Sequence, residues 1–248
     1  ESSSHLNSVA SDMAIFGGQT QAQWGRGDGF MDKKTVVNMH MEECSHHVSQ
    51  SIISRYYDES GAALDWFVGA SKNLYMAPES YAEIPADAQA NYMFPYMYPM
   101  PETYDYNKED LPCYPTSVGF SSLATVMADN LQAAVDAGAE VRYSTKGVEL
   151  ILNDEGAVAG IYAQAAGSDG YLKITAPSVI LATGDYLGNE DMMKFYAPEC
   201  VENGINILSI DLDDEGNYTN VGEGHKMGAW AGAAIEQWHA PMIHHMGG

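Results

Sequence analysis

Basic side chains are scarce in this chain, and their scarcity excludes several kinds of partner. The 248 residues carry 11 lysines and arginines against 34 aspartates and glutamates, which gives a formal net charge of −23. A surface of that sign repels the phosphates of nucleic acids and the headgroups of anionic lipids. We therefore expect no nucleic-acid partner and no binding to an anionic membrane surface.

Cysteines and long apolar runs are scarce as well. Cys44, Cys113 and Cys200 lie far apart and form no Cys-x-x-Cys pair, so they match no metal spacing and are expected to be buried thiols. They leave the redox compartment undecided. No run approaches the roughly 20 apolar residues that cross a bilayer, and no basic stretch before an apolar one opens the chain. We expect no membrane-spanning segment, and the localisation is open between cytoplasm and export.

The chain does have enough apolar sequence for a buried core. Hydrophobic residues make up 46% of it and charged residues 18%, which is a globular composition. Residues 1–30 are polar and turn-like, and most of the prolines fall between residues 76 and 116, which predicts an irregular but packed segment. The apolar spacing predicts helices over residues 32–57, 60–70, 117–137, 190–196 and 224–233.

Between the third and fourth of these helices the pattern changes to short strands. Residues 139–143, 147–152, 157–164 and 171–175 are separated by short turns, two of them rich in Asp and Gly, which predicts an antiparallel meander. The apolar run Ser178–Ala182 follows, and it is typical of a strand buried on both faces of a parallel sheet. A meander before such a strand is unusual for a plain nucleotide-binding fold.

Small residues stand at two places where a ligand could approach the main chain. Ala182, Thr183 and Gly184 end the apolar run, at the carboxyl edge of the expected sheet. Gly222, Glu223 and Gly224 open the last helix, where free N–H groups and the positive end of the helix dipole suit an electron-rich ring or an anion. Taken alone, each could equally be a tightly packed turn.

The order of these segments resembles the FAD-binding domain of the fumarate reductase and succinate dehydrogenase flavoproteins. The matching stretches read VELIL, GAVAGIYAQ, VILATGD, GNEDMMKFYAPE and TNVGEGHKMGAWAGAAIE. The resemblance implies an α/β fold: an FAD/NAD(P)-binding, glutathione-reductase-like three-layer domain with an antiparallel β-meander, over residues 1–236. Residues 237–248 would begin a substrate-capping domain. Asp185 departs from the family, which usually has a second glycine there, and it could tighten or displace the turn beside the cofactor.

The resemblance also implies which residues contact FAD. The expected contacts in the second half are the main chain of Val148, beside adenine, together with Ala182, Thr183, Gly184, Gly222, Glu223 and Gly224. In the first half, Glu1 would accept the ribose hydroxyls, and the loop with Asn7, Ser8 and Ser11 would pass the pyrophosphate, with Gly17 and Gly18 also at the cofactor. The family's GxGxxG turn would precede Glu1, and most of its cap would follow Gly248, so the domain is expected to be incomplete at both ends.

His244 falls where the family has a substrate-binding histidine, and we expect it to donate to a substrate carboxylate or carbonyl. It lies near His239 and His245, but no carboxylate or cysteine stands at ligand spacing, so no metal site is expected. The implied function is an FAD-dependent oxidoreductase that acts on an activated C=C or CH–CH bond of a small-molecule substrate, with an electron-donor protein or domain as a further partner. A noncatalytic flavoprotein fragment and an amino-acid oxidase of the same fold are the alternatives.

Overall fold

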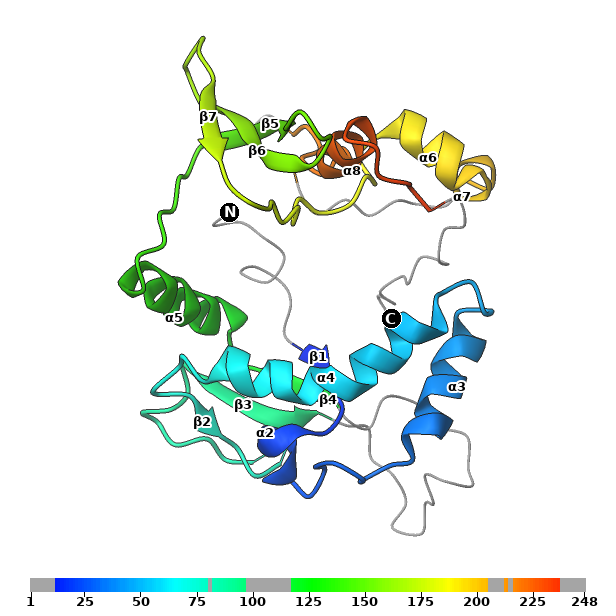
Figure 1. Ribbon diagram of the computed structural model, residues 1–248. Coiled ribbons are helices and arrows are strands. Elements are labelled where there is room, and N and C mark those ends of the chain that lie inside the picture. Colours follow the sequence, from blue (N-terminus) through cyan, green and yellow to red (C-terminus); the bar gives the residue numbers. More distant parts are fainter. Residues whose placement is uncertain (1–11, 80–81, 97–116, 205–211, 214–215, 237–248) are drawn as a thin grey trace. The chain divides into compact units, whose positions relative to one another are not determined.

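The computed structural model describes residues 12–79, 82–96, 117–204, 212–213 and 216–236. The chain divides into two compact units, Glu1–Glu140 and Val141–Gly248. Figure 1 colours them from blue to green and from green to red along the sequence. Each unit has its own sheet and its own helices, so each is described by itself.

The first unit contains a four-stranded sheet. Its strands are β1 (Asp12–Ala14), β2 (Tyr75–Met76), β3 (Tyr92–Tyr96) and β4 (Ser117–Phe120), in the order β1-β4-β3-β2. β4 runs antiparallel to both of its neighbours, whereas β2 and β3 are parallel. The predicted irregular segment after residue 76 therefore contains a strand, and the polar segment before residue 30 contains β1. The predicted helix over 117–137 begins later, because its first four residues form the buried strand β4.

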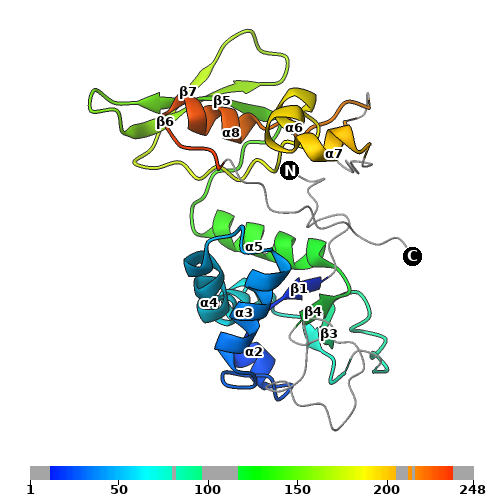
Figure 2. The same ribbon diagram turned by 90° about the vertical axis from the view of Figure 1, so that its right-hand side faces the viewer.

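The described residues of this unit form the helices α2 (Gly18–Ala22), α3 (Lys33–Glu43), α4 (Gln50–Val68) and α5 (Leu123–Asp136). Figure 2 shows α5 beside the sheet strands β1 and β4. The apolar residues of α4 and α5 pack on the sheet in one core, formed by the buried side chains Ile15, Leu64, Met93, Val118, Phe120, Leu123 and Val126.

The predicted single helix over 32–57 is wrong, because a turn divides it. Ser45 and His46 have φ angles of 50° and 59°, and the His46 N–H donates to the Met41 carbonyl at 2.8 Å, a bond that closes the end of a helix. Asp32 begins α3 by accepting a hydrogen bond from the Thr35 N–H. The predicted second helix over 60–70 is the continuation of α4.

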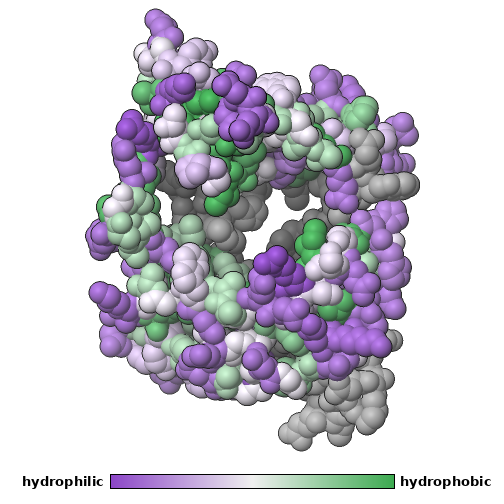
Figure 3. Space-filling model, in the orientation of Figure 1, coloured by the Kyte–Doolittle hydropathy of each residue, from purple (hydrophilic) through white to green (hydrophobic). Residues whose placement is uncertain are grey.

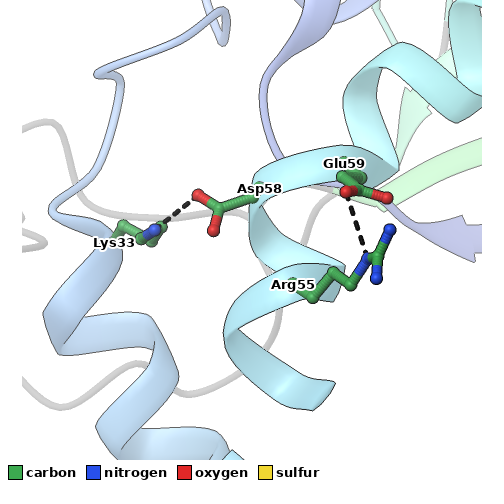
Figure 4. Close-up of polar contacts among 4 residues, drawn as sticks. All are labelled: Lys33, Arg55, Asp58 and Glu59. Atoms are coloured by element: carbon green, nitrogen blue, oxygen red, sulfur yellow. Dashed lines mark hydrogen bonds and ion pairs between the residues drawn. The ribbon is translucent and has the colours of Figure 1, made fainter. Parts of the chain in front are cut away.

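α3 and α4 are held together mainly by apolar contacts. Met31, Val36, Val37, Met41 and Tyr57 are buried between them. Figure 4 shows the ion pair Lys33–Asp58, which joins the two helices, and the pair Arg55–Glu59 within α4. All four side chains are well exposed, so each pair adds little to the stability of the fold. Hydrophilic residues gather over α3 on the face that Figure 3 shows, which is the solvated side of this helix pair.

The second unit contains the predicted meander. β5 (Thr145–Leu152), β6 (Val158–Ala165) and β7 (Leu172–Thr175) form an antiparallel sheet in sequence order, followed by α6 (Glu190–Tyr196), α7 (Pro198–Glu202) and α8 (Glu223–Trp230). The predicted strand over 139–143 is wrong, since those residues are exposed and pair with no strand of the described chain.

The predicted buried strand Ser178–Ala182 is also wrong in this structure. Its residues have no regular secondary structure and belong to no sheet of the described chain, and Ile180 is 91% exposed. A strand needs a neighbour to satisfy its N–H and C=O groups, and a parallel strand needs one on each side to be buried. The described residues provide no such neighbour, so the apolar pattern is present without the sheet that it predicts.

None of the helices in the described residues combines the length and the apolar character needed to span a membrane.

The packing of α2 against α4 gives a first test. A β-carbon on Gly61 would lie 2.5 Å from the Gly18 nitrogen, closer than any real contact. We expect Gly61→Ala to lower the free energy of unfolding by about 1–3 kcal/mol, because the helices must move apart. Urea unfolding measures this change, and Gln50→Ala, at an exposed position of the same helix, should change it by less than about 0.5 kcal/mol. A Gly61→Ala protein as stable as the parent would contradict the close approach.

A second test uses His40, whose Nδ1 lies 3.1 Å from the Tyr57 hydroxyl. Burial lowers the pKa of His40 below its ordinary value of 6.5. The His40 side chain therefore binds a proton near pH 6.5 in the unfolded chain but only at lower pH in the folded chain. The free energy of unfolding falls as the pH drops through that region. Urea unfolding between pH 8 and 5.5 should show this fall, and His40→Gln should make it smaller. An identical pH dependence in both proteins would exclude His40 as its source.

Candidate cofactor-binding site

Two loops of the second unit meet beside the start of α8. One loop, residues 184–189, follows residues 178–183, and the other, residues 218–222, leads into α8. Two main-chain hydrogen bonds join them: the Gly188 N–H donates to the Asn220 carbonyl at 3.0 Å, and the Gly222 N–H donates to the Asp185 carbonyl at 3.1 Å. We call this arrangement the loop pair.

Two polar side chains strengthen the loop pair. Oδ1 of Asp185 accepts hydrogen bonds from the Leu187 N–H at 2.7 Å and from the Asn220 side-chain amide at 2.8 Å. Nδ2 of Asn189 donates to the Val221 carbonyl at 3.0 Å, while its Oδ1 caps α6. Asn220 is 7% exposed, so the bond that its amide donates to Asp185 satisfies a buried polar group.

Gly222 and Gly224 are glycines for reasons of packing inside the protein. A β-carbon on Gly222, which has a φ of +74°, would lie 2.5 Å from the Met192 sulfur and 2.9 Å from Cβ of Tyr186. A β-carbon on Gly224 would overlap the Thr183 hydroxyl. Both glycines are buried, so the structure brings Thr183 and the start of α8 into direct contact.

Ala182, Thr183 and Gly184 leave their main chain accessible. All three residues are exposed, and the nearest atom to a β-carbon built on Gly184 is Cβ of Asn220 at 3.9 Å. Gly184 has a φ of +75°, a conformation that other residues adopt rarely. A flat or charged group could therefore approach the main chain here.

The start of α8 has no side-chain cap among the described residues. Glu223 at its first position forms an ion pair with Lys146 of β5. This pair holds the helix to the meander, as does the contact of Met227 with Gly147. His225, which belongs to α8, packs its ring edge-to-face on Tyr186 with the ring centroids 5.1 Å apart. Burial is the main cause that raises the pKa of Tyr186, so its hydroxyl stays neutral at ordinary pH.

Val148 lies at an irregularity of β5. Gly147 pairs with Ala163 and Glu149 pairs with Tyr162, so Val148 is the extra residue of a β-bulge. The extra residue of a bulge leaves its main-chain groups out of the ladder. Val148 therefore stands outside the regular pairing of β5, and the Lys146–Glu223 pair connects this part of β5 to the start of α8.

Gly17 and Gly18 lie in the first unit, at the start of α2. The Gly18 N–H donates to Asp28 at 3.0 Å, and the next two N–H groups donate to the Asp65 carboxylate at 2.8 and 2.7 Å. Burial would raise the pKa of Asp65, but these bonds and one from the Thr20 hydroxyl outweigh it and lower the pKa. The donors that an anion would use are thus engaged by carboxylates.

These carboxylates belong to a wider acidic cavity of about 920 Å³ in the first unit. Its lining includes Phe16, Gly18, Asp28, Asp32, Lys33, Tyr57, Asp58 and Asp65. Four aspartates and one lysine make it unsuited to a pyrophosphate, which carries negative charge itself. A role of Gly17 and Gly18 at a cofactor stays a prediction.

Several predicted residues lie outside the described part of the chain: Glu1, Asn7, Ser8, Ser11 and His244. Within it, no three His, Cys, Asp or Glu side chains come together as metal ligands. Sequence reasoning missed Asn189, Asn220 and Lys146. The two asparagines stand in the sequences GNED and TNVGEG. Their positions next to glycines were the sequence signal that could have identified them as site residues.

Comparison with known proteins was made for sequence and for structure. No protein-family profile matches the chain. The probable fumarate reductase Ifc3 of Shewanella frigidimarina is 31% identical over 117 residues, which are 47% of this chain and 18% of that protein. Two solved structures each overlap with 92% of this chain at 18% identity. The first is a flavocytochrome c3 fumarate reductase in its open conformation, with a TM-score of 0.59 and 34% of its length covered. The second is the 3-ketosteroid-Δ4-(5α)-dehydrogenase of Rhodococcus jostii RHA1 in complex with 4-androstene-3,17-dione, with a TM-score of 0.60 and 46% of its length covered.

These similarities define the class of the chain: a mixed α/β fold shared with these two enzymes. The chain is fumarate reductase-like in sequence, as its motifs predicted. It spans less than half the length of each of these three proteins.

The contact between Thr183 and α8 gives a test of the site. We expect Gly224→Ala to lower the thermal stability of the second unit, because its new methyl group would overlap the Thr183 hydroxyl. Thr183→Ala removes that hydroxyl, so the double variant Gly224→Ala/Thr183→Ala should recover most of the loss. Differential scanning calorimetry of the three variants measures the coupling. Additive losses would show that the two residues do not meet.

Proposed function

We propose that the whole protein containing these 248 residues is an FAD-dependent oxidoreductase that acts on an activated C=C or CH–CH bond. The observation that carries this proposal is the loop pair, which leaves the main chain of Ala182–Gly184 accessible beside the uncapped start of α8. An accessible main chain next to a helix N-terminus suits a dinucleotide with a flat ring system. The likeness to a fumarate reductase and to a steroid dehydrogenase supports the same class of reaction.

Different described residues would serve the adenosine side and the ring side of FAD. The main chain of Val148 at the bulge of β5 would meet the adenine, which needs only main-chain donors and acceptors. Ala182, Thr183 and Gly184 would lie against the ring system. At the start of α8, Gly222, Glu223 and Gly224 would contribute the helix dipole, and Glu223 and Gly224 their N–H groups, because the Gly222 N–H already donates to the Asp185 carbonyl and Glu223 pairs with Lys146 through its side chain.

The remaining assignments rest on the resemblance. Glu1 would accept the ribose hydroxyls, and the loop with Asn7, Ser8 and Ser11 would pass the pyrophosphate. The complete domain would be a glutathione-reductase-like three-layer fold, in which Ser178–Ala182 gains parallel neighbours. This arrangement would account for an apolar segment that pairs with no strand among the described residues.

When bound, FAD would supply the exchange of a hydride with a substrate carbon. The residues of this chain would hold the adenosine, keep water from one face of the ring and set the ring's position. His244 would donate a hydrogen bond to a carboxylate or carbonyl of the substrate, which polarises the adjacent C=C bond. The substrate would be a small enoate such as fumarate or a larger enone such as a steroid. An electron-donor protein or domain would reduce the flavin.

The chain by itself should hold FAD poorly. Ile180 is almost fully exposed, and Ser178–Ala182 pairs with no strand among the described residues. The main chain of Ala182–Gly184 therefore lacks a supporting sheet. We expect the purified 248 residues to show no stoichiometric flavin absorbance near 450 nm, whereas the whole protein should be yellow. The whole protein should also oxidise a reduced viologen when fumarate or a steroid enone is added. A colourless whole protein would refute the proposed function, and a stoichiometrically yellow 248-residue chain would refute only the weak binding.

A further inference from the structure

Asp185 makes three hydrogen bonds that together join the loop pair. Its carboxylate oxygen Oδ1 accepts from the Leu187 N–H within its own loop and from the Asn220 amide in the other. Its main-chain carbonyl accepts from the Gly222 N–H, the residue that begins α8. A glycine or alanine at position 185 would keep the main-chain bond and lose both side-chain bonds.

The first of these side-chain bonds fixes the turn after Gly184. A carboxylate that accepts from the N–H two residues later forms an Asx-turn, which sets the main-chain direction of its own loop. Gly184 stands immediately before it, with its main chain accessible and its φ at +75°. Asp185 therefore tightens the turn and does not displace it.

The second side-chain bond fixes the other loop. Asn220 is buried, and its Cβ is the nearest atom to the place where a side chain on Gly184 would begin. Its main-chain carbonyl also accepts from the Gly188 N–H. Through Asn220, Asp185 thus sets how far the main chain of Gly184 lies from the start of α8.

We propose that Asp185 is a positioning residue for the flavin ring: it holds the Gly184 main chain and the start of α8 at the separation that the ring requires, and it acts through Asn220 as a hydrogen-bond acceptor. This inference rests on the proposed function, since it assumes that the accessible main chain contacts FAD. The acceptor oxygen is what matters in this arrangement, so an asparagine at position 185 can replace the aspartate.

The experiment compares the FAD affinity of the whole protein with that of five variants by flavin fluorescence quenching. We expect Asp185→Ala to weaken FAD binding by about tenfold, since two hydrogen bonds that order the site are lost. Asp185→Asn should stay within about threefold of the parent. Asn220→Ala should weaken FAD binding in the same direction but by less, because the Leu187–Asp185 bond remains. Asp185→Ala/Asn220→Ala should lose little more than Asp185→Ala, because both changes break the bond between the two side chains. Asp191→Ala removes an exposed acid of α6 as a matched control and should bind like the parent.

Hydrogen exchange of the 248-residue chain gives a readout without cofactor. Asp185→Ala should speed amide exchange over residues 218–226, and Asp185→Asn should not. If the parent whole protein binds no FAD, the proposed function fails. If the parent binds FAD and Asp185→Ala binds equally well, or Asp185→Asn is as weak as Asp185→Ala, the positioning role fails while the proposed function stands.

Discussion

The fold depends on places where the main chain of a glycine lies closer to a neighbouring segment than a β-carbon allows. In the first unit, Gly61 of α4 lies against the main chain of Gly18, which lets α2 lie directly on α4. In the second unit, Gly224 lies against the side chain of Thr183, which brings residues 182–184 to the start of α8. At each place a side chain would separate elements that must stay in contact, so the same constraint organises the packing of α2 and the candidate site.

A second common feature is the use of carboxylates to satisfy main-chain N–H groups. Asp28 and Asp65 do so at the start of α2, Asp32 at the start of α3, and Asp185 in the loop pair. With 34 acidic and 11 basic side chains, most carboxylates cannot form ion pairs. Hydrogen bonds from N–H groups offer some of them a stabilising alternative, and near helix starts the dipole adds to it. The acidic composition thus has a structural use as well as an effect on partners.

Sequence reasoning predicted the elements whose signal is local. The meander follows from alternating residues and Asp-Gly turns, and α6 matches its predicted bounds of residues 190–196 because Asn189 caps it. The division of the helix at Ser45 and His46 was missed, since a short polar turn between two helices differs little from a polar helix face. The strand at Ser178–Ala182 was predicted from its apolar run, but strand formation needs neighbours that the described residues lack. Asn220 was missed because its role depends on a contact with Asp185, which is 35 residues away.

The exposed run Ser178–Ala182 has a consequence for any shortened form of the protein. It is largely apolar and uncharged, with Ile180 almost fully in solvent, and such segments pair readily with copies of themselves. Pro177 before it and Asp185 after it limit that pairing, because proline donates no hydrogen bond and carboxylates repel one another when chains stack. A truncation that exposes Ser178–Ala182 would therefore favour self-association through this run. Pro177 and Asp185 would oppose that self-association.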